Sequence, residues 1–229
     1  MAASNRIKIL TLATSLAALS PLACAQSTCY GRVDGGRLEN SVSLPREGPN
    51  FVRMAQGPIS AGRVFVHSTA YDVLLDAYAA LSINRPKIRW VYGETGLAQG
   101  GPMPPHKTHQ NGLSVDLFVP VLDKEGNSVQ FPNRADNGYG YQVDFNAVGQ
   151  NATHSIDFEA LGDLLYHLHK AADKRGSGLS LVVFQRELRP QLFETTRGKW
   201  LKETIPFPAW DDSVRHDDHI HVDFVARCQ

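Results

Sequence analysis

Histidine and aspartate residues are concentrated in two segments of this sequence, at spacings that suit binding of a metal ion. The first segment contains His106, His109 and Asp116, and the second contains His216, His219 and His221. Neutral imidazole and carboxylate groups suit Zn²⁺, and three protein ligands with one open position make a catalytic zinc site. A lone His-x-His pair is a common feature of proteins that bind no metal. A His-x6-Asp element (His109 and Asp116) and a His-x-His element (His219 and His221) in one chain are better explained by a shared metal ion.

These side chains converge only if two strands lie next to each other. Residues 113–119 alternate as a strand should, which places Asp116 on the face opposite the Leu and Val side chains. A closing strand is predicted at 219–226, and His219 and His221, two residues apart, project from the same side of it. If the two strands pair, a carboxylate meets the imidazoles. An unpaired buried carboxylate is costly, which favours a cation beside Asp116.

The remaining elements mix helices and strands without a regular strand–helix–strand rhythm. The spacing of apolar residues predicts helices over 68–81 and 157–175. Short β-prone runs predict strands at 88–92 and 179–184. Segments rich in turn-forming or polar residues predict loops at 93–112, 122–151 and, for the most part, 195–218. The mixture favours an α+β fold, in which a small antiparallel sheet carries the zinc site and is flanked by helices and long loops.

Composition excludes some classes of partner. The chain has 229 residues, 42% hydrophobic and 20% charged, which allows one sizeable core. Lys and Arg total 23, as do Asp and Glu, so the formal net charge is zero. Binding to nucleic acid normally needs a concentrated basic surface, and no such partner is expected.

Residues 1–25 have the features of a signal peptide. Arg6 and Lys8 precede a short apolar stretch, and residues 23–25 match a cleavage pattern of small residues. The stretch is too short and too rich in Ser, Thr and Ala for a good membrane span, so no integral span is expected after cleavage. Lipidation of Cys24 is disfavoured, because Pro21 stands where an aliphatic residue is needed. We therefore expect an exported protein that is periplasmic or secreted.

Cleavage would leave two cysteines, Cys29 and Cys228, near the ends of the mature chain. An even pair in an oxidising compartment predicts a disulfide that ties both termini to the domain, with two unpaired buried thiols as the alternative. Residues 26–62 are rich in Gly, Pro, Ser and Arg and are predicted to form an extended arm. Residues 63–229 are predicted to form one domain that carries the zinc site.

The two segments resemble those of the penicillin-insensitive murein endopeptidases. This family belongs to a wider group with the lysostaphin-type peptidases, the D-Ala-D-Ala metallopeptidases and the hedgehog N-terminal domain, which shares His-x6-Asp and His-x-His. The murein endopeptidases add a loop like residues 100–116 and a histidine three residues before the His-x-His pair, here His216. The likeness extends from about Asn50 to the C-terminus.

The resemblance implies that residues 63–229 are a zinc metallopeptidase domain that binds one Zn²⁺ per chain through His109, Asp116 and His221. The residues alone allow His219 and His221 to exchange roles; the family pattern makes His219 the proton acceptor beside the metal. His106 and His216 would then contact the transition state or support the ligands from outside, although hydrogen-bonded loop histidines are the alternative.

The implied activity is hydrolysis of peptide cross-links in peptidoglycan, at the amide bond between D-alanine and a diamino acid. A D,D-carboxypeptidase or an L,D-endopeptidase on the same scaffold is one alternative. A non-catalytic zinc domain that binds cell-wall peptide or a protein is another. Asp217 and Asp218 could orient an imidazole or lie in a solvated turn. Aromatic residues in the loops could line a groove or simply pack: Tyr139, Tyr141, Trp200 and Trp210.

Overall fold

The protein folds around a five-stranded mixed sheet with the strand order β11-β12-β7-β6-β4. The computed structural model describes residues 26–55, 57, 62–210 and 214–229, so the predicted signal peptide and Cys24 lie outside the described residues. The strands of this sheet are β4 (Phe51–Arg53), β6 (Trp90–Tyr92), β7 (Ser114–Phe118), β11 (Leu179–Val183) and β12 (His219–Phe224). All neighbours are antiparallel except β4 and β6, which are parallel. The predicted α+β class is confirmed.

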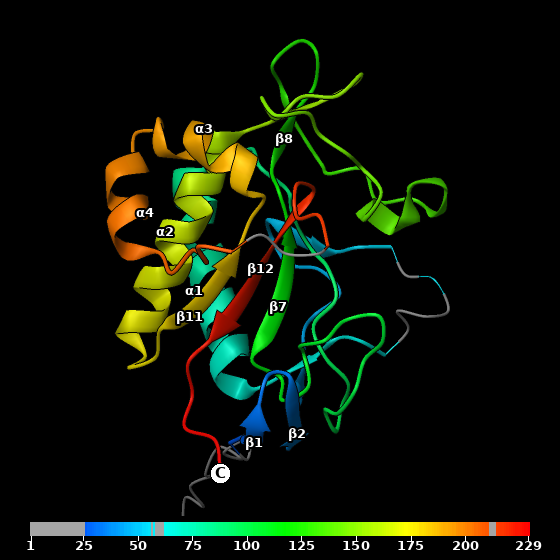
Figure 1. The fold of residues 1–229 in the computed structure, drawn as a ribbon, viewed down its shortest axis with the longest axis vertical. Helices are drawn as coiled ribbons and strands as arrows, with labels where there is room; N and C mark the ends of the chain where they lie inside the picture. Colours follow the sequence, from blue (N-terminus) through cyan, green and yellow to red (C-terminus); the bar gives the residue numbers. More distant parts are fainter. Residues whose placement is uncertain (1–25, 56, 58–61, 211–213) are drawn as a thin grey trace, which may run out of the picture.

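Helices cover one side of the sheet, and long loops lie on the other (Figure 1). The helices are α1 (Ser68–Asn84), α2 (Phe158–Lys174), α3 (Arg189–Phe193) and α4 (Gly198–Thr204), with 3-10 turns η1 (Ala135–Gly140) and η2 (Arg186–Leu188). Helix α2 begins after Asp157, whose carboxylate accepts a hydrogen bond from the backbone of Ala160. In the described part of the chain, none of the helices combines the length and apolar character that crossing a bilayer requires.

Strands β7 and β12 pair as the sequence predicted, and their register places Asp116 directly opposite His221. Every residue of both strands is buried, because helices pack on one face of the sheet and loops on the other. The polar face of β7 is therefore covered by protein. A carboxylate on this buried face must therefore have hydrogen-bond donors or a cation beside it.

Residues 26–62, which were expected to form an arm, contribute β4 to the main sheet and also form a hairpin. The smaller strands are β1 (Thr28–Arg32), β2 (Gly35–Glu39), β3 (Val42–Ser43), β5 (Phe65–Val66), β8 (Val121–Leu122), β9 (Ser128–Val129) and β10 (Ser155–Ile156). The β1–β2 hairpin contacts the loop 93–112, where Gln110 donates a backbone hydrogen bond to Val33 (3.0 Å) and Leu38 donates one to Gln99 (3.0 Å). The hairpin thereby holds the loop that carries His106 and His109.

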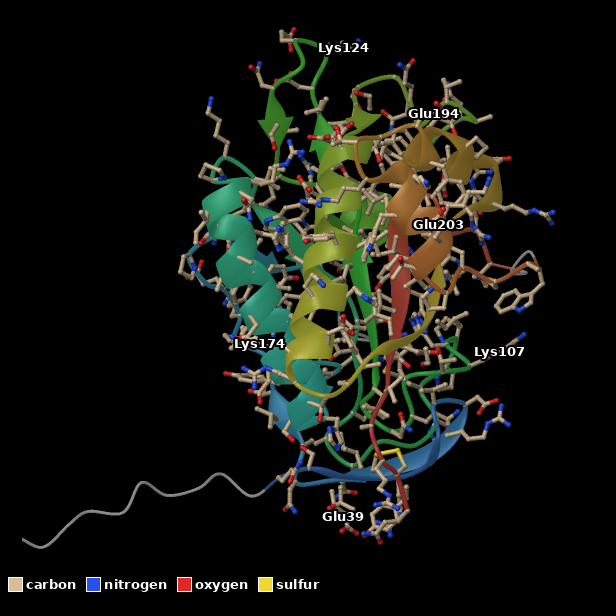
Figure 2. All side chains as sticks on the ribbon, turned by 90° about the vertical axis from the view of Figure 1, so that its left-hand side faces the viewer. Glu39, Lys107, Lys124, Lys174, Glu194 and Glu203 are labelled. Carbon is tan, nitrogen blue, oxygen red and sulfur yellow. A yellow bond between two sulfur atoms is a disulfide. The ribbon has the colours of Figure 1, made fainter. Side chains whose placement is uncertain are left out.

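A disulfide joins Cys29 of β1 to Cys228 near the C-terminus, as the sequence predicted. Figure 2 shows this sulfur–sulfur bond beside the β1–β2 hairpin. The two cysteines are 199 residues apart in the sequence. Asn111, in the loop held by the hairpin, directs its amide nitrogen at the Cys228 sulfur (3.6 Å). The disulfide thus joins β1 to the C-terminal segment, next to the loop that leads into β7.

We expect the double substitution Cys29→Ser and Cys228→Ser to lower the free energy of unfolding by about 2–5 kcal/mol, because a long loop is no longer closed in the unfolded chain. Denaturant titration of both proteins, with and without reductant, measures the difference. Reductant should destabilise the wild type and leave the double variant unchanged. Equal unfolding midpoints for the oxidised wild type and the variant would contradict the prediction.

Candidate metal centre

Asp116 lies at the middle of β7, and its carboxylate is almost completely buried. Its Oδ1 atom lies 2.9 Å from His221 Nδ1 and 3.3 Å from His109 Nε2. Its Oδ2 atom accepts a hydrogen bond from the hydroxyl of Tyr141 (3.1 Å). Burial opposes ionisation of Asp116, but the neighbouring imidazoles hold its carboxyl pKa well below the ordinary value. The residue is therefore a buried anion on which imidazole nitrogens converge.

His109 is fully buried and has a left-handed backbone, with φ of 67°. Its Nδ1 donates to the carbonyl oxygen of Thr95, which fixes that nitrogen as the N–H of a neutral ring. Burial lowers the pKa of His109 and so favours the neutral form. Its Nε2 is buried and makes no hydrogen bond. A lone pair on this nitrogen thus faces a carboxylate oxygen across 3.3 Å, an arrangement that a cation between them would stabilise.

His221 reaches the same oxygen of Asp116 from the neighbouring strand. Its Nε2 lies 2.9 Å from Asp223 Oδ1, and the Ser114 hydroxyl donates to that same oxygen. Burial opposes charge on His221, but hydrogen bonds to Asp116 and Asp223 raise its pKa to about 10. Asp223 can accept the Nε2 proton and leave Nδ1 as the ligand atom, the usual arrangement for a histidine that binds a metal.

The separations fit a zinc ion. Two ligands of tetrahedral zinc, each bonded at about 2.0–2.1 Å, are roughly 3.3 Å apart. The observed 3.3 Å between His109 and Asp116 equals this, and the 2.9 Å between His221 and Asp116 is slightly shorter. The rings of His109 and His221 lie 4.8 Å apart, edge to face. Two imidazole nitrogens therefore approach one carboxylate oxygen at separations close to those of ligands on a common divalent ion.

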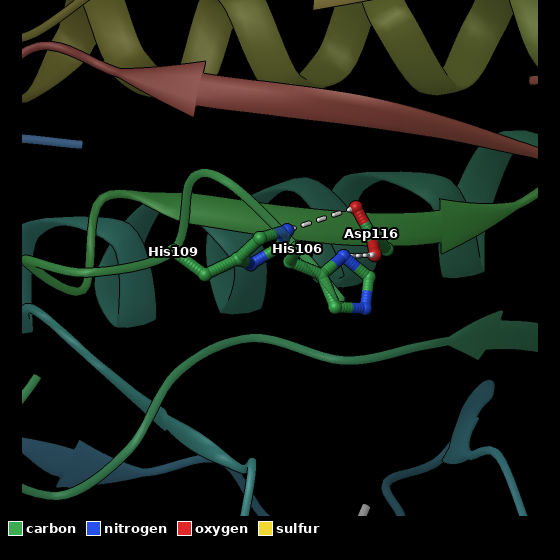
Figure 3. A group of neighbouring side chains, drawn as sticks. All are labelled: His106, His109 and Asp116. Carbon is green, nitrogen blue, oxygen red and sulfur yellow. Dashed lines mark ion pairs between the residues drawn. The ribbon is translucent and has the colours of Figure 1, made fainter. Parts of the chain in front are cut away.

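His106 lies beside this group, and Figure 3 shows it with His109 and Asp116. One potential ligand atom from each of these three residues lies within 4.8 Å of the others. The nearest carboxylate oxygen to His106 Nδ1 is Asp116 Oδ2, at 3.9 Å, and not the oxygen shared by His109 and His221. Its Nε2 bonds the carboxylate of Glu94, and its side chain is 21% exposed. The side chain of His106 is thus more exposed to solvent than those of His109 and His221.

His219 projects from β12 two residues before His221. Its Nδ1 bonds the carboxylate of Asp218, which leaves Nε2 as the nitrogen available to substrate. Burial disfavours the charged ring, but the Asp218 carboxylate raises the pKa of His219 above its ordinary value. The ring of His216 lies 4.7 Å away, and burial lowers the pKa of His216 to about 4. The pKa values of the two histidines are therefore shifted in opposite directions, upward for His219 and downward for His216.

The structure brings together the six candidate site residues of the sequence: His106, His109, Asp116, His216, His219 and His221. The sequence leaves open whether Asp217 and Asp218 orient an imidazole or lie in a solvated turn. Asp218 orients His219, whereas Asp217 accepts from the Phe145 backbone and pairs with Arg215, so neither aspartate lies in a solvated turn. Tyr141, left open between groove and packing, contacts Asp116 directly. Glu94 and Asp223 were not anticipated. Asp223 carries a signal in retrospect, since it continues the alternation of His219 and His221.

Comparison with protein families places this geometry in context. A profile of the penicillin-insensitive murein endopeptidases matches residues 29–228, which is most of the chain. Comparison with curated proteins finds no match. The match includes both histidine segments and the two cysteines of the disulfide, Cys29 and Cys228. The chain therefore belongs to the penicillin-insensitive murein endopeptidase family, whose members are peptidases that act on peptidoglycan.

Proposed function

We propose that this protein is a zinc metallo-endopeptidase that hydrolyses the amide bond between D-alanine and a diamino acid in peptidoglycan cross-links. The observation that carries the proposal is the approach of His109 Nε2 to Asp116 Oδ1, where a lone pair and a carboxylate face each other without a hydrogen bond. Family membership supplies the substrate class. The nitrogen and oxygen donors, with no thiolate among them, favour Zn²⁺.

The proposed ligand atoms are His109 Nε2, Asp116 Oδ1 and His221 Nδ1, for one zinc ion per chain. A bound zinc ion would lower the pKa of a water molecule and polarise the scissile carbonyl. His219 accepts the proton of the attacking water at Nε2 and delivers it to the leaving amine, while Asp218 holds the ring in place. His106 lies beside the proposed ligands and stabilises the charge that develops on the carbonyl oxygen. His216 is a neutral ring whose Nδ1 bonds the carbonyl oxygen of Val214, and it supports His219, whose ring lies 4.7 Å away.

Export is part of the same proposal. Residues 1–25 would be removed as a signal peptide, residues 26–62 would precede the metallopeptidase domain at 63–229, and the enzyme would act in the periplasm or outside the cell. Two observations support this: disulfides persist in oxidising compartments, and the family substrate is a cell-wall polymer.

The first test is metal removal. A strong chelator should abolish cleavage of cross-linked muropeptides, and one equivalent of Zn²⁺ should restore it, because the attacking water is not activated without the metal. Full activity in a metal-free preparation would contradict the proposal. Release of fragments from purified sacculi, analysed by mass spectrometry, identifies the bond that is cut. Loss of a terminal D-alanine would indicate a D,D-carboxypeptidase, cleavage of L,D bonds an L,D-endopeptidase, and zinc-dependent binding without release a non-catalytic domain.

A further inference from the structure

A buried ion pair lies directly behind His106. Arg63 Nη1 lies 3.1 Å from each carboxylate oxygen of Glu94, and the two side chains are only 9% and 7% exposed. The other arm of the guanidinium, Nη2, donates to the carbonyl oxygen of Pro104 (2.7 Å). Arg63 therefore binds at once the carboxylate that contacts His106 and the backbone two residues before His106.

Glu94 touches the site through its side chain and its backbone. Its Oε2 atom bonds His106 Nε2. Its backbone N–H donates to the hydroxyl of Tyr141 (3.0 Å), and its carbonyl accepts from the backbone N–H of Asp116 (3.0 Å). The segment that fixes the place of Asp116 thus also presents the carboxylate that fixes His106.

Stability alone is a poor explanation for this pair. Taking an arginine and a glutamate out of water is expensive, and apolar side chains of similar size are often as stabilising. An apolar pair, however, would offer no acceptor to His106 Nε2. Without that acceptor the partly exposed ring could rotate, and its Nδ1 would lose its direction towards Asp116.

We propose that Glu94, held by Arg63, is a positioning residue that fixes the ring of His106 beside the metal centre. The catalytic consequence rests on the proposed function, whereas the ring orientation does not. Glu94 acts through another side chain, so its removal should affect the reaction only while His106 is present.

A double-mutant cycle tests this dependence. Glu94→Gln should lower kcat on cross-linked muropeptides roughly 10- to 100-fold, the range typical of partners outside a metal's ligands, with KM and zinc content unchanged. In a His106→Ala background the same substitution should change kcat by no more than about twofold. An equal loss in both backgrounds would overturn the proposal.

A spectroscopic readout separates this inference from the proposed function. The ring N–H that His106 donates to Glu94 should give a downfield proton resonance in the purified protein, which His106→Ala removes and thereby assigns. Glu94→Gln should shift or broaden it; an unchanged resonance would overturn the proposal. If the wild type cleaves no muropeptide but Glu94→Gln shifts or broadens this resonance as expected, the proposed function fails and the positioning role stands.

A control variant shows whether loss of any ion pair, and not of the Glu94 contact to His106 in particular, lowers kcat. Asp163→Asn removes a carboxylate from α2 that pairs with Arg85 and Arg197, so it should lower Tm without altering kcat or the resonance.

If Glu94→Gln does not fold, Arg63→Lys is tested instead, because lysine keeps the charge but lacks the planar guanidinium that bridges Glu94 and Pro104. Arg63→Lys should lower kcat with zinc retained; wild-type kcat with a wild-type resonance would overturn the proposal.

Discussion

Replacing His221 by alanine is expected to deprive the protein of its zinc and of nearly all muropeptide hydrolysis, whereas His106→Ala is expected to leave zinc bound. Both histidines approach Asp116, so the two substitutions distinguish two candidate ligand sets. One set is His109, Asp116 and His221; the other replaces His221 by His106.

The geometry favours the first set. His109 and His221 share one oxygen of Asp116, at separations close to those of ligands on a common ion, whereas His106 is nearest to the other oxygen at 3.9 Å. Asp223 also supports the far nitrogen of His221, which favours the neutral ring with Nδ1 as the ligand atom. Removing His221 takes away a ligand, and zinc affinity should fall by more than the roughly 100-fold that loss of an outer partner causes.

Zinc affinity is measured by competition with a chelating dye, and bound zinc by elemental analysis after dialysis. His106→Ala, the matched control, should retain one zinc per chain while kcat falls, since a contact to the developing charge is lost. The opposite pattern, with zinc lost from His106→Ala and kept by His221→Ala, would assign His106 as the ligand and refute the proposed set.

The fold was largely predictable because its main elements carry strong local patterns. The helix predicted over 68–81 is α1, which continues to Asn84, and the one predicted over 157–175 is α2. Helix α4 lies inside the segment 195–218 that was predicted to be mostly loop. It has only seven residues, too few for a periodic pattern to emerge, and it is stabilised by packing rather than by its own sequence.

The sequence predicted the histidines and the aspartate of the metal site, but it did not predict which side chains hold them in place. Asp116 and His221 stand out because they alternate with apolar residues in their strands, and pairing of those strands brings them together. Glu94 and Tyr141 give no such signal, because each lies in a long loop and contacts the site through folding of distant segments. Tyr141 is 47 residues from the Glu94 backbone that it binds, and no spacing rule relates the two. The register of β7 on β12, which sets Asp116 opposite His221, likewise depends on the packed structure.

The second large effect is expected at His219. Substitution by alanine should reduce kcat roughly 10²- to 10⁴-fold, the usual contribution of a general acid–base residue, while one zinc per chain is retained. His219 differs from His221 in its partners, because its Nδ1 bonds Asp218 and not the Asp116 carboxylate, which favours a role in proton transfer over coordination. The zinc content of this variant also distinguishes the two assignments of His219 and His221 that the His-x-His pattern alone permits.

Three variants make the test specific. His169→Ala, in α2 where His169 pairs with Asp173 and packs against Trp200, is the matched control and should retain wild-type kcat and zinc. Asp218→Asn should lower kcat less than His219→Ala does, because the imidazole remains but is held less firmly. Loss of zinc from His219→Ala would assign His219 to the metal instead, and unchanged cleavage with zinc retained would remove it from proton transfer. Because Asp218 is buried against His219 and is not among the proposed zinc ligands, a fall in kcat of both variants at constant zinc content would locate proton transfer at this pair.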